Sequence, residues 1–428
     1  MKRILNMMAF LSFIIWVLLV GQPVSAQITV TSITDLGTLG GTTSEATGIN
    51  NLGQVVGYST TSSGENHAFL WTAKGGMQDL GTLGGADSYA SGINNLGQVV
   101  GGSTTSSGEY HSFLWTAQGG TQDLGTLGGY SSAYGINDLG QVVGVFTQPE
   151  YHPFLWTAQE GMQDMGTLGI AYGINGLGQV VGMSTTSSGY RPFLWTAQGG
   201  ISDLGLTTDS YATGINNAEQ IVGARTTAPG IQAFLWTAQT GIQDLGTLGG
   251  TCYSHASGIN DFGTVVGWSR ELCESSRLYE SDAFFWTAQT GMQDLGTLGG
   301  ASSANAINNQ GNVVGSSFTA SGGEHATLWT LSSDTQIPTQ QVNLITTAVQ
   351  GLITSGELNT GQGTALNGKL DAATKKLNEG NKVAASNVLQ AFINEVRANI
   401  KVGKLTAALG QPLIDAAIKA ISQIDDVY

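Results

Sequence analysis

Charged residues are scarce in this chain: Asp, Glu, Lys and Arg together make up 11% of its 428 residues. Glycine, by contrast, occurs 63 times. A chain with few charges and abundant Gly, Ser and Thr favours many short strands joined by tight turns, and it disfavours a mainly helical fold.

Basic residues are fewer than acidic residues. Residues 27–340 hold 23 acidic and five basic residues, whereas residues 341–428 hold seven and eight. A strongly acidic surface repels the phosphate backbone of nucleic acids. We therefore expect no nucleic-acid partner.

Long hydrophobic runs are missing after residue 26. The first 26 residues combine a basic "MKR", the apolar "MAFLSFIIWVLLV" and the small-residue "PVSA" before Gln27. This pattern predicts a secretory signal peptide over residues 1–26, since the apolar run is short for a membrane span. An uncleaved N-terminal anchor is the alternative. We expect an exported chain, extracellular or associated with the cell envelope, without a membrane span after signal removal.

Cysteine occurs only twice, at Cys252 and Cys273. The spacing matches no CxxC motif, and the five histidines are dispersed, so no metal centre is indicated. In an exported protein such a pair predicts a disulfide. A bridge that closes this segment would stabilise the fold by about 3 kcal/mol on the chain-entropy model.

Catalytic motifs are also missing. The sequence has no GxSxG or HExxH motif, and no carboxylate pair stands out from the repeat pattern. We expect a protein that is not an enzyme, although a ring-shaped repeat fold can bring acids from several repeats together at its centre.

What the sequence has in abundance is internal repetition. A "GIN" or "AIN" segment, a "VVG" or "IVG" segment and a tryptophan follow one another seven times, at a period of about 39 to 50 residues. The tryptophans are Trp71, Trp115, Trp156, Trp195, Trp236, Trp286 and Trp329.

Each repeat predicts four strands. In the first, these are "SEATGIN", "QVVGYST", "AFLWT" and "MQDLG", separated by tight Asn/Gly or Gly-rich turns and one polar loop. Four strands per period of about 40 residues are typical of a propeller blade. The predicted fold is therefore mainly β, a seven-bladed β-propeller over residues 27–330; an open all-β solenoid is the alternative.

The ends of the repeat region predict how the ring closes. The N-terminal "ITDLGTLGG" follows no tryptophan segment, and the seventh tryptophan segment has no such string after it. Joining the N-terminal strand to the last repeat would complete seven blades of four strands and remove an open sheet edge.

The repeated "HAFLW", "GINNLGQVVG" and "DLGTLGG" resemble the HAF repeat family of extracellular proteins. The resemblance spans about 300 residues and implies a secreted β-repeat protein. The fifth unit, "NNAEQIVG", and the seventh, "HATLW", depart from the pattern, so we expect their blades to be less regular.

Comparison of the units predicts a constant face and a variable face. The turns between strands one and two and between strands three and four barely change, whereas the loops between strands two and three differ in every unit. Variable loops on a rigid scaffold commonly carry recognition. The candidate ligand-binding residues in and beside these loops are His67, Tyr110, His111, Tyr151, His152, Tyr190, Arg191, Arg225 and His325. The alternative is that they are solvated loop residues.

Two repeated residue types have structural interpretations. The tryptophans of "FLWT" sit at strand centres, which favours packing between blades over a role as sugar platforms. The Asp of "DLG" sits beside a Gly-rich crossover, where Asp commonly accepts backbone N–H bonds. A calcium-binding ring of these carboxylates is the less favoured alternative, and we expect no cofactor.

The β pattern stops at "SSDTQIPTQQ". A linker is predicted over residues 331–341 and a small all-α bundle over residues 342–428, where apolar residues follow helical spacing. The run "LNGKLDAATKKLNEGNKVAASNVLQAFINEV", with "GKLTAALGQPLIDAA", resembles the FIMAH domain. That resemblance implies a bacterial extracellular setting and an interaction role; an accessory domain without a partner is the alternative.

Together these patterns predict a secreted, non-enzymatic recognition or envelope-associated protein, monomeric, with an extracellular protein or polysaccharide as partner. A carbohydrate-active propeller, either a lectin or a glycosidase, is the alternative.

Overall fold

The structure is a computed structural model that describes residues 28–206, 208–228, 230–249, 253–270, 281–331, 337–354, 356–379 and 381–425. Its described residues fall into two compact units: a β unit, Thr29–Leu331, and a helical unit that begins after it in the chain. The predicted signal peptide and the predicted Cys252–Cys273 disulfide lie outside the described residues.

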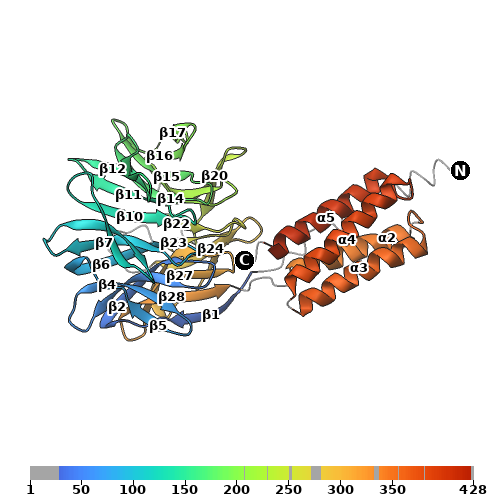
Figure 1. Cartoon of the computed structure of the whole chain (residues 1–428), viewed down its shortest axis with the longest axis horizontal. Coiled ribbons are helices and arrows are strands. Elements are labelled where there is room, and N and C mark those ends of the chain that lie inside the picture. Colours follow the sequence, from blue (N-terminus) through green and yellow to red (C-terminus); the bar gives the residue numbers. More distant parts are fainter. Residues whose placement is uncertain are drawn as a thin grey trace. The chain divides into compact units, whose positions relative to one another are not determined.

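The described residues of the β unit form 28 strands, which pair as five sheets of four and one sheet of eight that consists of two groups of four. Figure 1 shows these strands side by side around the unit. The first three groups are β2 (Gly40–Ile49), β3 (Val55–Thr61), β4 (Asn66–Thr72) and β5 (Gly76–Asp79); β6 (Gly84–Ile93), β7 (Val99–Thr105), β8 (Tyr110–Thr116) and β9 (Gly120–Gly125); and β10 (Ser131–Ile136), β11 (Val142–Thr147), β12 (Tyr151–Thr157) and β13 (Gly161–Asp164).

The next three groups are β14 (Gly169–Ile174), β15 (Val180–Thr186), β16 (Gly189–Thr196) and β17 (Gly200–Asp203); β18 (Ser210–Ile215), β19 (Ile221–Thr226), β20 (Ile231–Thr237) and β21 (Gly241–Gly246); and β22 (Tyr253–Ile259), β23 (Val265–Arg270), β24 (Asp282–Thr287) and β25 (Gly291–Asp294). The last group joins β26 (Gly299–Ile307), β27 (Asn312–Thr319) and β28 (Glu324–Leu331) to β1 (Val30–Asp35).

Within each group the paired strands are antiparallel, as expected for propeller blades. One parallel bridge, between Ile231 and Tyr253, links the fifth blade to the sixth. In the first strand of every blade the register shifts by one residue near the strand's end, between Ala46 and Gly48 in the first blade. A Cβ atom on Gly48 would lie 3.4 Å from the Cα atom of Gly92, so glycine here lets neighbouring first strands approach closely.

The core lies between successive blades. A phenylalanine on the third strand is almost completely buried in the first six blades: Phe69, Phe113, Phe154, Phe193, Phe234 and Phe284. The tryptophan two residues later in each blade is buried or packs against the same core, and Trp329 is fully buried. The predicted core role of the tryptophans is confirmed.

The N-terminal strand completes the last blade, as predicted. β1 pairs with β28 from Val30 opposite Leu331 to Asp35 opposite Thr327. The Leu36 N–H then donates to the Ala326 carbonyl at 2.9 Å, and the Leu36 side chain is buried. The edge strand that blade seven would otherwise expose is therefore covered by the chain's own beginning.

The helical unit consists of α2 (Ile337–Thr354), α3 (Thr360–Asn378), α4 (Lys382–Lys401) and α5 (Ala407–Asp425), which bury a common apolar core. The linker predicted for residues 331–341 is shorter in the structure, because β28 extends to Leu331 and α2 begins at Ile337. Pro338 is tolerated in the first helical turn, where its missing N–H would have no intrahelical acceptor. Among the described helices, none combines the length and apolar character that a membrane crossing requires.

Candidate functional site: the two ends of the central channel

The turn that follows each first strand is organised by one asparagine. In the first blade, Asn50 Oδ1 accepts the N–H groups of Leu52 and Gln54, both at 3.0 Å, and Asn50 Nδ2 donates to Gln54 Oε1 at 2.7 Å. These bonds fix the tight turn that the "NNLG" pattern predicts, and the Asn50 side chain is only 3% exposed.

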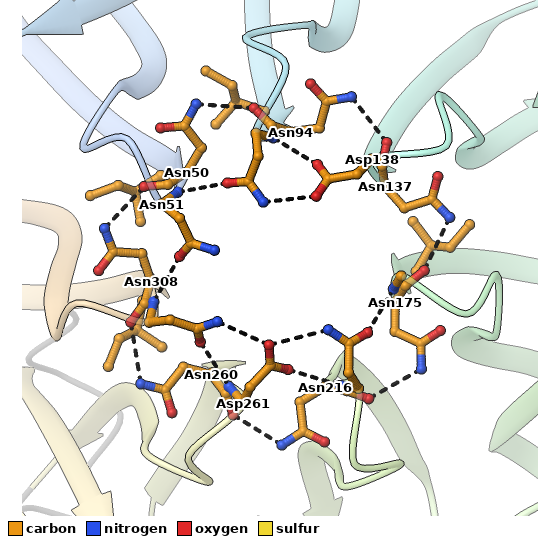
Figure 2. Close-up of a pocket in the computed structure, with 18 of the residues that line it drawn as sticks. Asn50, Asn51, Asn94, Asn137, Asp138, Asn175, Asn216, Asn260, Asp261 and Asn308 are labelled. Atoms are coloured by element: carbon orange, nitrogen blue, oxygen red, sulfur yellow. Dashed lines mark hydrogen bonds between the residues drawn. The ribbon is translucent and has the colours of Figure 1, made fainter. Parts of the chain in front are cut away.

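The same asparagines also join the blades into a circle, which Figure 2 shows end on. Each Nδ2 donates to the backbone carbonyl of the equivalent asparagine in the next blade, at 2.9–3.2 Å, and the last donates to the first. We call this set the inner asparagine ring: Asn50, Asn94, Asn137, Asn175, Asn216, Asn260 and Asn308.

A second, more exposed ring uses the next residue in each turn. The N–H of this residue donates to the side-chain oxygen of its counterpart in the next blade at 2.8–3.0 Å, in six of the seven junctions. The missing link is at Gly176, which has no side chain to accept from Asp138. The outer ring comprises Asn51, Asn95, Asp138, Gly176, Asn217, Asp261 and Asn309.

The two rings, with the isoleucines beside them, line a cavity of about 210 Å³ at this end of the channel. Large apolar side chains stand exposed at the tips of the surrounding turns: Leu52, Leu96, Leu139, Leu177 and Phe262. We call this the turn end. The chain also enters and leaves the β unit here, because Val30 pairs with Leu331, whose N–H bonds the carbonyl of Gly311 in the last such turn.

At the opposite end, the loop end, most predicted binding residues are engaged with the repeated Asp of "DLG". His67 Nδ1 lies 2.7 Å from Asp79 Oδ2, and Arg225 pairs with Asp244 through two nitrogens at 2.7 and 2.9 Å. His111, His152 and His325 face Asp123, Asp164 and Asp35 at 2.9, 3.3 and 2.8 Å. The four histidine contacts tie the third strand of a blade to the fourth, and the Arg225 contact ties the second strand of blade five to the fourth.

The repeated Asp also has the backbone role predicted for it. In six blades its Oδ1 accepts the N–H of the glycine two residues later, at 2.7–2.8 Å. Each carboxylate thus has partners of its own, and within the described residues no group of three or more His, Cys, Asp or Glu is close enough to hold a metal ion.

The remaining predicted residues do not form one site. Tyr110 covers Gly102 and stacks on Tyr130, with ring centroids 5.2 Å apart. Tyr151 and Tyr190 are 55% and 47% exposed in separate blades. Arg191 bonds to the oxygens of Ser188 at 3.3 and 3.4 Å. A ligand-binding role for all nine residues stays a prediction.

The sequence reasoning missed a series of aromatic side chains that lie between the turn-end cavity and the loop end. Ring contacts join Tyr58 to Tyr89, Tyr134 to Tyr172, Tyr211 to His255 and His255 to Trp268, with centroids 5.0–5.6 Å apart. Electrostatic or hydrogen-bond interactions bridge the gaps between these pairs. We call this set the aromatic collar: Tyr58, Tyr89, Tyr110, Tyr130, Tyr134, Tyr172, Tyr211, His255 and Trp268.

The collar runs across blades one to six, mainly on their first two strands, and each of its side chains is partly exposed. Its members on the first strand lie two to four residues before the isoleucine of the turn-end cavity. This spacing places them up to about 13 Å farther along the channel.

Burial sets the protonation of the collar. It raises the pKa of Tyr58, Tyr110 and Tyr134 well above the usual range and that of Tyr172 to about 12, with smaller contributions from neighbouring acids or tyrosines. Burial also lowers the pKa of His255 to about 4. At neutral pH these tyrosines therefore keep their protons and His255 is an uncharged imidazole.

Blade seven interrupts the collar with polar groups. Asn305 Nδ2 donates to Glu45 Oε1 and to the Ala46 carbonyl, both at 2.9 Å, and Ser316 donates to Glu324 at 2.8 Å. The Tyr58 hydroxyl donates to the other oxygen of Glu45.

A signal for the collar was present in the sequence. The signal is the residue three positions before the first residue of each "GIN" or "AIN" segment. This residue is Glu45 in the first blade, and in the other units it is Tyr89, Ser132, Ile170, Tyr211, His255 and Ser303. This variation inside a repeated strand is comparable to that of the loops. It could have been found by comparing strands as well as loops between the units.

The strand pairing and the closed hydrogen-bond circle define a β-propeller, followed by a helical domain. Residues 342–422 match the FIMAH domain, in agreement with the sequence resemblance. No curated protein matches this chain.

Among solved structures, the β unit is similar to the β-propeller domain of the Trilobed protease from Pyrococcus furiosus, with 10% identity, a TM-score of 0.44, and coverage of 64% of this chain and 89% of that one. It is also similar to the BP39L lectin from Burkholderia pseudomallei, with 8% identity, a TM-score of 0.42, and coverage of 64% and 91%. The architecture described here rests on the strand pairing itself.

Proposed function

We propose that this protein is a secreted or envelope-associated recognition protein of the HAF repeat type, not an enzyme, and that it binds an extracellular ligand at the loop end of its propeller. The observation that carries this proposal is the difference between the two ends of the channel. At the turn end, polar groups bond one blade to the next (Figure 2), whereas the loop end and the aromatic collar beside it carry residues that differ from blade to blade.

Two further features support the proposal. The acidic surface suits a polysaccharide or protein ligand better than a nucleic acid. The FIMAH match fits an extracellular setting, which the resemblance of its sequence implies.

The proposal is tested by blocking one end at a time. In a background in which Cys252 and Cys273 are replaced by serine, Ser106→Cys places a thiol in an exposed loop of blade two, and Leu96→Cys places one on an exposed turn of the same blade. Each variant is coupled to polyethylene glycol. Binding is then measured on arrays of extracellular polysaccharides and secreted proteins, with and without calcium.

We expect the polymer at residue 106 to abolish binding and the polymer at residue 96 to leave it unchanged. Loss of binding only with the polymer at residue 96 would place the ligand at the turn end and contradict the proposal. Turnover of a bound polysaccharide would contradict the non-enzymatic role and favour the alternative, a glycosidase.

A further inference from the structure

The aromatic collar is a surface built across six blades that no structural requirement of a single blade explains. Blades three and seven place Ser132 and Ser303 where blades two and five have Tyr89 and Tyr211. The scaffold therefore tolerates a small residue at this position, and a blade does not need the tyrosine in order to fold.

The chemistry of the collar suits a ligand that is uncharged and rich in hydroxyl groups. Its tyrosine hydroxyls and the imidazole of His255 are neutral hydrogen-bonding groups between aromatic rings. Three carboxylates act on the collar tyrosines, Glu45, Asp87 and Glu324, and each already accepts hydrogen bonds within the protein. Glu45 accepts them from Tyr58 and Asn305, Asp87 from the Asn66 N–H and Glu324 from Ser316. Amphipathic ligands with apolar faces and polar edges match such a wall.

The arrangement of the rings argues against a small cationic ligand. A cation is held best over the face of a tryptophan. Here the protein's own guanidinium, that of Arg270, already lies 5.0 Å from the centre of the Trp268 ring. The other rings pair with one another in edge, tilted or stacked contacts and follow one another around the channel, so they form an extended wall and do not converge on one point.

We infer that the aromatic collar binds a neutral glycan, with sugar rings lying against its tyrosines and sugar hydroxyls bonded to its phenol, imidazole and amide groups. This inference rests on the proposed function and sharpens it. It assigns the ligand class, and it places the contact between protein and ligand on the inner strands and not at the loop tips.

The experiment compares two pairs of tyrosines at the same end of the propeller. Tyr89→Ser and Tyr211→Ser each introduce the residue that other blades carry at the equivalent position. Tyr151→Ser and Tyr190→Ser form the comparison pair, because both are exposed residues that the sequence predicts to bind ligand, and Leu139→Ser and Leu177→Ser, on exposed turns at the turn end, are the controls. Neutral glycans that bind the unmodified full-length protein on an array are then titrated against each variant, and thermal unfolding verifies that each variant is folded.

We expect Tyr89→Ser and Tyr211→Ser each to weaken glycan binding by about tenfold or more, the comparison pair to weaken it less than the collar pair does, and the controls to change it by less than about twofold. Tyr211→Phe, which keeps the ring, should retain most of the affinity. Loss of binding in the comparison pair alone would overturn the inference while leaving the proposed function intact. So would binding of tetramethylammonium or choline in place of neutral glycans. If no neutral glycan binds at all, the inference is wrong, and the polymer-blocking experiment with protein ligands decides the proposed function separately.

Discussion

The two ends of the propeller channel show how one repeat can serve two purposes. At the turn end, seven nearly identical turns bond to one another, and the asparagine that shapes each turn also joins it to the next blade. Farther along the first strand, toward the loop end, the position of Glu45 carries glutamate, tyrosine, serine, isoleucine or histidine in the different blades. Because the hydrogen bonds between blades are concentrated at the turn end, the residues toward the loop end can differ from blade to blade.

The largest effect should come from removing the strand that closes the ring. Deleting residues 28–37 removes β1, its pairing with β28 and the buried Leu36. We expect aggregation or loss of cooperative unfolding, because blade seven is left with an exposed edge. Calorimetry and size-exclusion chromatography measure this outcome. A variant with an unchanged melting curve would refute closure by the N-terminal strand.

A smaller but substantial effect should follow from changing one amide of the inner asparagine ring. In Asn94→Asp the side chain loses the donors to Gln98 Oε1 at 2.7 Å and to the Asn137 carbonyl at 3.0 Å, and a buried carboxylate then faces both acceptors. The free energy of unfolding should fall by about 2–4 kcal/mol, measured by denaturant titration.

The matched control is an Asn→Asp substitution in the outer ring, at the turn residue that follows the inner-ring asparagine. Asn51→Asp keeps the acceptor for the Asn309 N–H, as Asp138 and Asp261 do in their own blades, so a change within about 0.5 kcal/mol is expected. Gly176→Asn should act in the opposite direction and raise the free energy of unfolding by about 1 kcal/mol or less, because it supplies the acceptor missing from the outer ring. Equal losses in Asn94→Asp and Asn51→Asp would show that the inner ring has no special role.

A further effect concerns the aromatic collar and depends on pH. Because burial lowers the pKa of His255 to about 4, below the value of about 6.5 in an unfolded chain, the unfolded state takes up the proton first as the pH falls. The stability that His255 contributes is therefore present above about pH 6.5 and is lost between about pH 6.5 and 4, by at most about 3 kcal/mol.

This prediction is measured as a difference between two proteins, so that the contributions of all other residues cancel. Denaturant unfolding of the unmodified protein and of His255→Gln is followed from pH 7.5 to pH 4. The variant should lose less stability over this interval because glutamine does not titrate. Parallel pH profiles would indicate that His255 is solvated and not buried in the collar.

The sequence predicted the blades well because their determinants are local and repeated. The Asn/Gly turns, the β-branched second strand and the tryptophan segment each recur seven times, and the unmatched "ITDLGTLGG" correctly indicated which strand closes the ring. The helices were also predicted, although α2 begins at Ile337, within the polar segment interpreted as linker.

The candidate site was predicted less well, because its geometry depends on contacts between blades. No partner for His67 or Arg225 was evident from the sequence, yet His67 meets Asp79 on the neighbouring strand and Arg225 meets Asp244 two strands away. Tyr110 looked like a loop residue, yet it folds over Gly102 and fills the space that a side chain occupies in other blades. Such contacts follow from the register of paired strands, which the repeat pattern alone does not specify.

The inner asparagine ring has a direction. Each of its seven amides donates forward to the next blade and each carbonyl accepts from the blade behind, so the bonds all run the same way around the circle. In this circuit the junction between the last blade and the first is equivalent to the other six. The polypeptide is linear, but its bonding at the channel is cyclic, so a circularly permuted chain that opened between two other blades would meet the same set of partners.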